Sequence, residues 1–445
     1  MSVSVIAVLP ANDALRNSAA AFVQGQFSLD VENAGAPATL QLDPNYPAIP
    51  IGGATAESMA LDAMTPQASE GFAVRATIDI EEGATPPERV DGVRIFADPQ
   101  IEPAITCGND PPVGNAQDVA TALDVPSLSA KGLNGDRVAI GVMDTGFNLA
   151  YLATKLGLTP GFDSANSWTT PAAIYAPGSY PAAPPTQHGT MCAFDALIAA
   201  PNATLLDFPI LTLQGPAGGS VISGLLSSAL QAYGQVLFSW GSGGGLANYN
   251  AVVISNSWAV FKASWDFPAG HPGRYIDNPN HPFNLLVATV VRAGVDVVFA
   301  AGNCGADCPD SRCDVTTGTI RGANAHTDVL TVAGCDTTGA RVGYSSQGPS
   351  IAGMYQEKPD VTAYTHFLGS EVFGTGQPDS GTSAACPVMA GCVAAIRTKM
   401  ARGINSNTVF GAFRAHTGAS GTAGWNADYG FGIINPVAAA TSLGL

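Results

Sequence analysis

The sequence has little charge and no long apolar run. Only 12% of its 445 residues are charged, and 35 acidic against 18 basic side chains leave a formal net charge of −17. Such a surface would be repelled by phosphate backbones and anionic membranes, so we expect no nucleic-acid partner. No apolar run reaches the roughly 18 to 20 residues that a membrane-spanning helix needs. The acidity itself is typical of a solvated surface.

The compartment is left open by the first residues and by the cysteines. Val3 to Leu9 is apolar, follows no positive charge and stops at Pro10, which predicts a strand and not a secretory signal. The protein either stays inside the cell or has an export signal outside this sequence. Three of the eight cysteines cluster at Cys304, Cys308 and Cys313. A disulfide there would suit an oxidising compartment, whereas a zinc site is the weaker interpretation because the usual CxxC pairs are missing.

The chain divides into two regions of different pattern. Residues 1–105 predict a small α+β domain, with a helix over Asp13 to Gln24 and strands over Val3 to Leu9, Gly71 to Ile80 and Val93 to Ala97. Residues 106–118 bring Gly, Pro and Asn together in TCGNDPPVGN, which indicates a linker or a processing region.

From residue 119 to 445, short apolar strands alternate with helices, as in a three-layer α/β fold with a mostly parallel, doubly wound sheet. The clearest strands are Val138 to Met143, Val252 to Asn256, Val295 to Ala300 and Val329 to Ala333. The clearest helices are His188 to Ala200, Asn284 to Ala293 and Ser383 to Ala401. Long loops are expected at Asp163 to Gln187, Gln214 to Asn250 and Phe261 to Phe283, where they could cover a site.

Four strings carry candidate chemistry. VAIGVMDTGFN ends a strand at Asp144, where open α/β sheets place their sites, although an Asp there is more often a turn former. QHGTMCAFDALIAA begins a helix at His188, a position that a capping residue also occupies. VDVVFAAGNCG runs a strand into Asn303, alone a turn residue. DSGTSAACPVMAGCVAAI is the most specific, because Ser383 opens an apolar helix whose unpaired amides favour negative charge.

Taken together, these strings resemble the signature regions of the subtilase family of serine peptidases. The order Asp, His, Ser is the subtilisin order, and the resemblance extends from about residue 119 to Leu445. Further matches are ISNSWA, YSSQGP, KPDVTA and GFGIINPVAAA. The family's Ser-Pro-His string after the nucleophile is replaced here by Cys386, Pro387 and Val388, which puts the local packing in doubt.

The resemblance implies a role for each matching residue. Ser383 would attack a peptide carbonyl, His188 would move the proton, and Asp144 would hold the imidazole in the useful tautomer. The amide of Ser383 and the side chain of Asn303 would bind the oxyanion. Cys192 resembles the cysteine of proteinase K-like members, and we expect a packed thiol that bulky mercurials can reach.

Peptide or protein substrates would add a strand beside ISNSWA, with small residues leaving room for a sizeable apolar side chain before the cut. The residues that would line this strand on its two sides are Ser257, Trp258, Ala259, Ala300, Ala301 and Gly302.

The same resemblance implies that residues 1–105 are a ferredoxin-like propeptide. Such a propeptide would inhibit its own catalytic domain and would assist the folding of that domain. Its last strand and tail would lie in VDGVRIFADPQIEP, with self-cleavage near Thr106 to Asn115. We expect a monomer that needs no cofactor. Calcium is common in the family, and Asp307, Asp310 and Asp314 could offer oxygens, but a plain acidic loop is the preferred interpretation.

Two other functions remain open at this stage. A peptide ligase or precursor-specific maturation protease would use the same acyl-enzyme, but a ligase would resolve it with an amine instead of water. A catalytically silent binding scaffold would keep the fold and fail to react with a fluorophosphonate.

Overall fold

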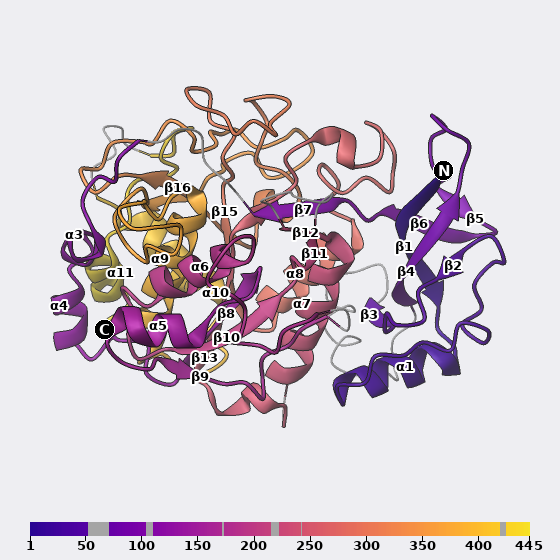
Figure 1. The fold of residues 1–445 in the computed structure, drawn as a ribbon, viewed down its shortest axis with the longest axis horizontal. Coiled ribbons are helices and arrows are strands. Elements are labelled where there is room, and N and C mark those ends of the chain that lie inside the picture. The colour runs from indigo at the N-terminus through magenta and orange to yellow at the C-terminus, as the bar shows by residue number, and fades with distance from the viewer. Residues whose placement is uncertain (52–70, 104–109, 171–172, 215–221, 242, 419–423) are drawn as a thin grey trace.

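A seven-stranded parallel sheet forms the centre of the protein. We describe it from a computed structural model of residues 1–445 without 52–70, 104–109, 171–172, 215–221, 242 and 419–423 (Figure 1). The strand order is β17-β16-β15-β13-β8-β10-β9, and each neighbouring pair is parallel. The strands are β8 Val138–Asp144, β9 Gly161–Phe162, β10 Thr204–Pro209, β13 Ala251–Asn256, β15 Asp296–Ala300, β16 Leu330–Cys335 and β17 Val361–Tyr364.

Helices cover both faces of this sheet and complete a three-layer α/β fold (Figure 1). One face packs against α5 Leu149–Leu156, α6 Gln187–Ala196, α9 Thr382–Arg397, α10 Ser406–Ala415 and α11 Pro436–Ser442. The other face packs against α7 Leu226–Trp240 and α8 Pro282–Arg292. Two short helices, α3 Ala116–Ala122 and α4 Val125–Ala130, and three 3-10 turns, Gly245–Asn248, Ala263–Trp265 and Gly322–Ala325, complete the described helices after residue 110. Because both faces are covered, β8 and β13 are buried along their whole length.

The loop expected over Gln214 to Asn250 is wrong in its centre. The 15-residue helix α7 lies there, and its described side chains are mostly buried. The Gly and Ser residues on both sides of α7 hid its apolar periodicity. The helices expected over His188 to Ala200 and Ser383 to Ala401 end earlier, at Ala196 and Arg397.

A separate antiparallel sheet forms the N-terminal domain, on the right in Figure 1. Its order is β2-β4-β1-β6-β5, with β3 also paired to β4. The strands are β1 Ser2–Pro10, β2 Gln41–Leu42, β3 Ile49–Ile51, β4 Gly71–Asp79, β5 Arg89–Val90 and β6 Val93–Ala97, and the helix α1 spans Asp13–Val23. The order β2-β4-β1-β6 is that of a ferredoxin-like sheet, but residues 80–92 contain the short strand β5 in place of the second crossover helix.

A third, small sheet joins the two regions. Its order is β11-β12-β7-β14, with strands β7 Gln100–Pro103, β11 Leu213–Gln214, β12 Ile222–Leu225 and β14 Trp258–Ala259. The last strand of the N-terminal region, β7, therefore lies between two strands of the region that contains the parallel sheet, antiparallel to both. The expected domain boundary at residue 105 and part of the segment Thr106 to Asn115 lie outside the described residues.

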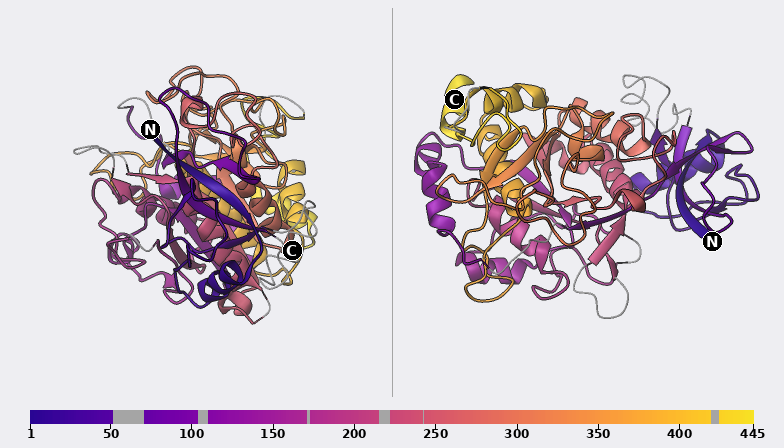
Figure 2. Two further views of the ribbon diagram at one scale, coloured as in Figure 1. Left: turned by 90° about the vertical axis from the view of Figure 1, so that its right-hand side faces the viewer. Right: turned by 90° about the horizontal axis from the view of Figure 1, so that it is seen from above.

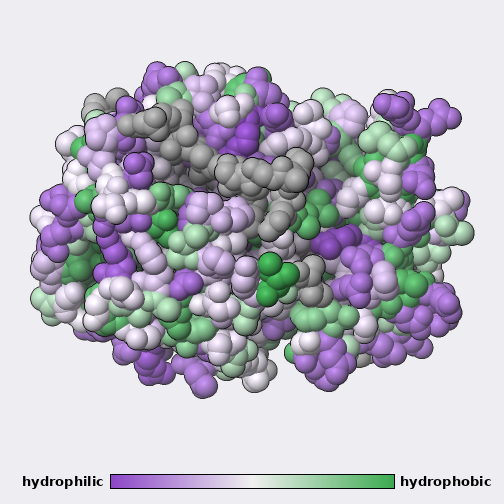
Figure 3. Space-filling view, in the orientation of Figure 1, coloured by the Kyte–Doolittle hydropathy of each residue, from purple (hydrophilic) through white to green (hydrophobic). Residues whose placement is uncertain are grey.

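The N-terminal domain rests on α7 and α8, as the view from above shows (Figure 2). Hydrophilic side chains cover its outer rim in Figure 3, while one face of its sheet packs inward. Tyr46 Oη donates to the carbonyl of Ser227 over 2.9 Å, and Arg75 Nε donates to Ser227 Oγ over 2.7 Å. Within the described part of the chain, no helix has the length and apolar character needed to cross a membrane.

Candidate active site

Three sequence-predicted residues lie at the carboxyl edge of the parallel sheet. Asp144 is the last residue of β8, Ser257 directly follows β13, and Asn303 lies three residues after β15. Parallel strands end at one edge of a sheet, so these side chains gather there. The starts of α6 and α9 bring His188 and Ser383 to the same edge, since Cys192 Sγ on α6 lies 3.6 Å from the carbonyl oxygen of Ser383.

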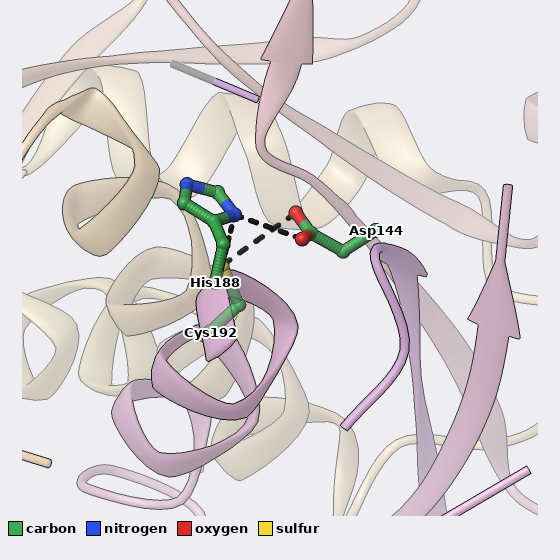
Figure 4. Close-up of side chains that lie close together, drawn as sticks. All are labelled: Asp144, His188 and Cys192. Carbon is green, nitrogen blue, oxygen red and sulfur yellow. Dashed lines mark hydrogen bonds and ion pairs between the residues drawn. The ribbon is translucent and has the colours of Figure 1, made fainter. Parts of the chain in front are cut away.

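Asp144 and His188 form a buried pair. The Nδ1 atom of His188 lies 2.8 Å from Asp144 Oδ1, and the two side chains are 8% and 1% exposed (Figure 4). The backbone amide of Thr145 also donates to Asp144 Oδ1, over 2.7 Å. A buried carboxylate bonded to Nδ1–H fixes the neutral imidazole in the tautomer whose Nε2 can accept a proton. Within the described residues, His188 Nε2 has no hydrogen-bond partner.

The glycines of the DTG and HGT strings allow this approach. Gly146 has φ +86°, and a Cβ atom there would lie 2.4 Å from the ring of Tyr180. A Cβ atom on Gly189 would lie 2.4 Å from the carbonyl oxygen of Gly146. Thr145 Oγ1 then joins the two strings, because it donates to the carbonyl of Thr186 over 2.8 Å and accepts from Gly189 N over 2.9 Å. Sequence reasoning gave Thr145 no role, and only its place within DTG could have identified it.

Ser383 lies at the first turn of α9, fully buried. Its Oγ donates to the carbonyl of Ser257 over 3.3 Å, and Ser257 Oγ donates to the carbonyl of Ser383 over 3.0 Å. Gly381, the N-cap residue of α9, has φ +82°, in the left-handed region that favours glycine. The nucleophile candidate is thereby joined to Ser257, the first of the predicted substrate-binding residues after β13.

The side chain of Asn303 is oriented by Thr382. Its Oδ1 accepts from both the amide and the hydroxyl of Thr382, each over 2.9 Å. With the oxygen held on that side, the amide nitrogen is the group presented on the opposite side of the side chain. Gly302, at φ +99°, supplies the sharp turn after β15 and donates to Thr382 Oγ1 over 3.0 Å.

The predicted substrate-binding residues lie along this edge. Trp258 and Ala259 pair with Pro103 and Glu102 of β7. On the other side, the predicted residues Ala300 and Ala301 are 1% exposed, and Ala301 N donates to the carbonyl of Val332. Strand β7 of the chain itself therefore lies beside ISNSWA, at the place where the sequence predicts a bound substrate strand.

A cavity of about 340 Å³ lies beside the start of α6. Thr186 in its lining directly precedes α6, and Leu211 donates its amide to the carbonyl of Asp144 over 3.1 Å. The rest of the lining is mostly aromatic and proline side chains: Ala173, Ile174, Tyr175, Tyr180, Pro181, Pro184, Pro185 and Thr212. An apolar side chain would fit such a space next to the Asp–His pair.

Cys192 lies behind the pair, as Figure 4 shows. Its Sγ is 3.8 Å from both Asp144 Oδ2 and His188 Nδ1. Burial, followed by the negative charge of Asp144, raises the pKa of this thiol well above its ordinary value, so it stays protonated. A protonated, buried thiol is a poor nucleophile, in agreement with the expected packed thiol. In the described part of the chain, Asp144, His188 and Cys192 are also the one His/Cys/Asp/Glu group close enough to share a metal ion.

The cysteine and aspartate cluster has a different chemistry from a metal site. Cys304 and Cys313 form a disulfide, and Cys308 is also disulfide-bonded, so the zinc interpretation is wrong. The three aspartates considered for calcium face three different arginines: Asp307 pairs with Arg341, Asp310 with Arg312, and Asp314 with Arg321.

Comparisons with known proteins agree with this geometry. A model of the Subtilase family matches residues 135–432. Subtilisin of Bacillus pumilus is 27% identical over 321 residues, which is 72% of this chain and 96% of that protein. Subtilisin DY of Bacillus licheniformis is 26% identical over 326 residues, covering 70% and 94%.

A solved structure is similar over almost the whole chain. Fervidolysin from Fervidobacterium pennivorans, described as a keratinolytic enzyme related to subtilisin, superposes with a TM-score of 0.58 at 14% identity. The match covers 99% of this chain and 61% of that one, and at this identity it shows the fold alone. Because the family model covers well over half of the sequence, the chain belongs to the subtilase family and is a serine endopeptidase.

Proposed function

We propose that Ser383, His188 and Asp144 form the catalytic triad of this endopeptidase, and that the enzyme cleaves its own N-terminal domain. The observation that carries the proposal is the buried Asp144–His188 pair, which lies at the same edge of the sheet as Ser383, with strand β7 paired alongside. Ser383 Oγ bonds to the carbonyl of Ser257 here. On substrate binding the hydroxyl turns to His188 Nε2, which takes its proton as the carbonyl is attacked and later gives it to the leaving amine.

Asn303 Nδ2 and the amide of Ser383 stabilise the oxyanion that develops in this step. The support is the orientation of Asn303, whose Oδ1 is held by Thr382. The amide of Ser383 belongs to the first turn of α9, where backbone N–H groups have no partner within the helix. Two such donors at a water-poor site lower the barrier more than they would in water.

Strand β7 occupies the place of a substrate. It pairs with β12 on one side and β14 on the other, Ile101 is fully buried, and Pro103 lies opposite Trp258. A strand continued in this antiparallel register places its next residue opposite Ser257, next to Ser383. The bond that the enzyme attacks in its own chain would then follow residue 104, slightly ahead of the segment Thr106 to Asn115, and residues 104–109 lie outside the described part of the chain.

The disulfide-bonded cysteines favour an oxidising compartment for this reaction. Cys304 and Cys313 are disulfide-bonded, and such bonds persist in oxidising surroundings. We therefore propose that the enzyme works outside the reducing cytosol. Intact mass with and without reductant tests this, because purified protein with all cysteines alkylatable before reduction would contradict it.

A fluorophosphonate probe and N-terminal sequencing test the proposal together. Wild-type protein should label on Ser383 and yield a new N-terminus near residue 105. The variant Ser383→Ala should remain unlabelled and uncut, while Ser442→Ala, on the surface helix α11, should behave as wild type. Failure of the wild type to label would favour a silent scaffold. A Ser383→Ala protein that still matures when pure would disprove self-processing.

A further inference from the structure

Arg312 connects the disulfide loop to the strand in the substrate position. This arginine lies between Cys304 and Cys313, and its Nη1 is 2.5 Å from Glu102 Oε2 of β7. Its Nη2 donates to the carbonyl of Pro103 over 3.0 Å. One side chain of the catalytic region thus binds both the side chain of one β7 residue and the backbone of the next.

The guanidinium of Arg312 is held in place before any substrate arrives. Asp310 accepts from its Nε over 2.9 Å and from its Nη2 over 2.7 Å. The guanidinium carbon lies 4.0 Å from the ring centre of Phe261, and the side chain is only 15% exposed. A guanidinium with these contacts loses little conformational freedom when it binds a carboxylate. The donors on Nη1 remain directed at the position of Glu102.

The register of β7 identifies the substrate position concerned. Glu102 lies opposite Ala259 and Pro103 opposite Trp258, so the following position of a bound strand falls opposite Ser257. Ser257 is the residue whose carbonyl binds the Ser383 hydroxyl. A residue in the place of Glu102 is therefore the third before the bond that is attacked.

We propose that Arg312 is a specificity-determining residue that selects an acidic side chain at this third position before the cut. The inference rests on the proposed function, in which β7 stands where a substrate binds. A glutamate there accepts a hydrogen bond from Nη1 with opposite charges on the two groups in a largely buried place, glutamine accepts a weaker bond because it carries no charge, and lysine opposes a cation. The bond from Nη2 to the next carbonyl is independent of sequence, so every substrate gains it and the selection comes from the carboxylate.

Three peptides that differ only at this position test the inference on the mature wild-type enzyme. With Glu, Gln or Lys there, kcat/KM should fall in that order, with Glu favoured over Gln by about tenfold or more. Arg312→Gln should bring the Glu-to-Gln ratio close to one, and Arg312→Lys should keep part of it. Arg292→Gln is the matched control, because Arg292 is 43% exposed at the end of α8 and should leave the ratio unchanged.

The outcomes separate this inference from the proposed function. Equal cleavage of the three peptides by wild-type enzyme, or an unchanged ratio in folded Arg312→Gln, would overturn the specificity role while the triad stands. If no peptide is cleaved and Ser383 does not label, the proposed function itself has failed. Should the Arg312 variants not fold, the wild-type peptide series still decides, since it requires no variant.

Discussion

The two main sheets of this protein bury their apolar faces in different ways. The parallel sheet of the catalytic region is covered on both faces by helices of the same region, so its central strands β8 and β13 are buried along their whole length. The antiparallel sheet of the N-terminal domain has its own core on one face, with α1. Its other face contributes Ile6, Tyr46 and Phe96 to a core that it shares with α7 and α8. The parallel sheet thus has both faces covered from within its own region, whereas the antiparallel sheet buries one face against its neighbour.

Each region also contributes buried groups to the other. Phe267, from the catalytic region, is a member of the core of the N-terminal domain and is 5% exposed. Asp98 of the N-terminal domain accepts from Ser227 N over 2.7 Å in the first turn of α7, whose own N-cap residue, Leu225, has no side-chain cap. A carboxylate at a helix N-terminus is favourable. The two regions therefore share buried contacts that neither could form alone, and the N-terminal domain should lose stability if it is removed.

Asp144→Asn should separate the two regions most sharply. The change keeps the shape of the side chain but removes its charge and replaces one acceptor oxygen with an amide donor, so the His188 tautomer is no longer fixed and kcat should fall by about 10⁴-fold. Docking of the N-terminal domain, measured by hydrogen exchange in β1 and β4, should not change. Asp13→Asn is the control, because this aspartate is fully exposed in the N-terminal domain. A loss smaller than tenfold would remove Asp144 from the proposed triad.

Phe267→Ala should lower the stability of the N-terminal domain, although the substituted residue belongs to the catalytic region. Replacing a buried phenylalanine with alanine lowers the free energy of unfolding by about 3 to 5 kcal/mol. Here the resulting cavity would lie in the core of the N-terminal domain, although Phe267 belongs to the catalytic region. In an uncut Ser383→Ala background, exchange of the β1 and β4 amides should speed up, with β8 and β13 unchanged. Phe373→Ala provides the comparison, since Phe373 is 39% exposed. Equal protection of the β1 and β4 amides in both variants would show that the N-terminal domain is stable without the Phe267 side chain.

His281 should make docking sensitive to acid. Its Nδ1 accepts from Phe283 N over 3.3 Å, and its Nε2 donates to the carbonyl of Ala97 in the N-terminal domain over 3.0 Å. Burial lowers the pKa of His281 from 6.5 to about 3. The docked state therefore binds fewer protons than an undocked state with an exposed ring. Docking should be strongest above pH 6.5 and should weaken by up to about tenfold per unit as the pH falls toward 3.

The groups around His281 set the control for this experiment. Phe96 and Tyr275 face the ring, and Arg94 lies over Phe96. Burial raises the pKa of nearby Asp266 to about 6, which gives a pH effect of opposite sign below that value. His281→Gln should flatten the acid dependence of β1 and β4 exchange, after correction for intrinsic rates, and exposed His416→Gln should not. An unchanged slope in His281→Gln would assign the acid effect elsewhere.

The parts that sequence reasoning predicted are those in which local chemistry and the fold agree. Asp144 and Asn303 follow apolar strands, so their common edge could be inferred once the sheet was assumed parallel. Helix α7 was missed because Gly and Ser surround it. Arg312 could not be predicted at all, because its partner Glu102 is 210 residues away and meets it only through the docking of β7. Long-range pairing of two surface-type residues leaves no signal in spacing or periodicity.

Cys192→Ala should produce the smallest change in turnover. The thiol touches Asp144 and His188 but stays protonated, so its loss should alter kcat/KM by less than about tenfold. A bulky mercurial should inhibit the wild type by displacing His188 and should have no effect on Cys192→Ala, as activity assays after labelling would show. Cys392→Ala is the matched control, because Cys392 is equally buried in α9 without a contact to the pair among the described residues. Full activity after complete labelling of Cys192 would mean that the space behind the imidazole tolerates a heavy substituent, and that the Asp144–His188 bond is held by Thr145 and Gly189 without help from the thiol.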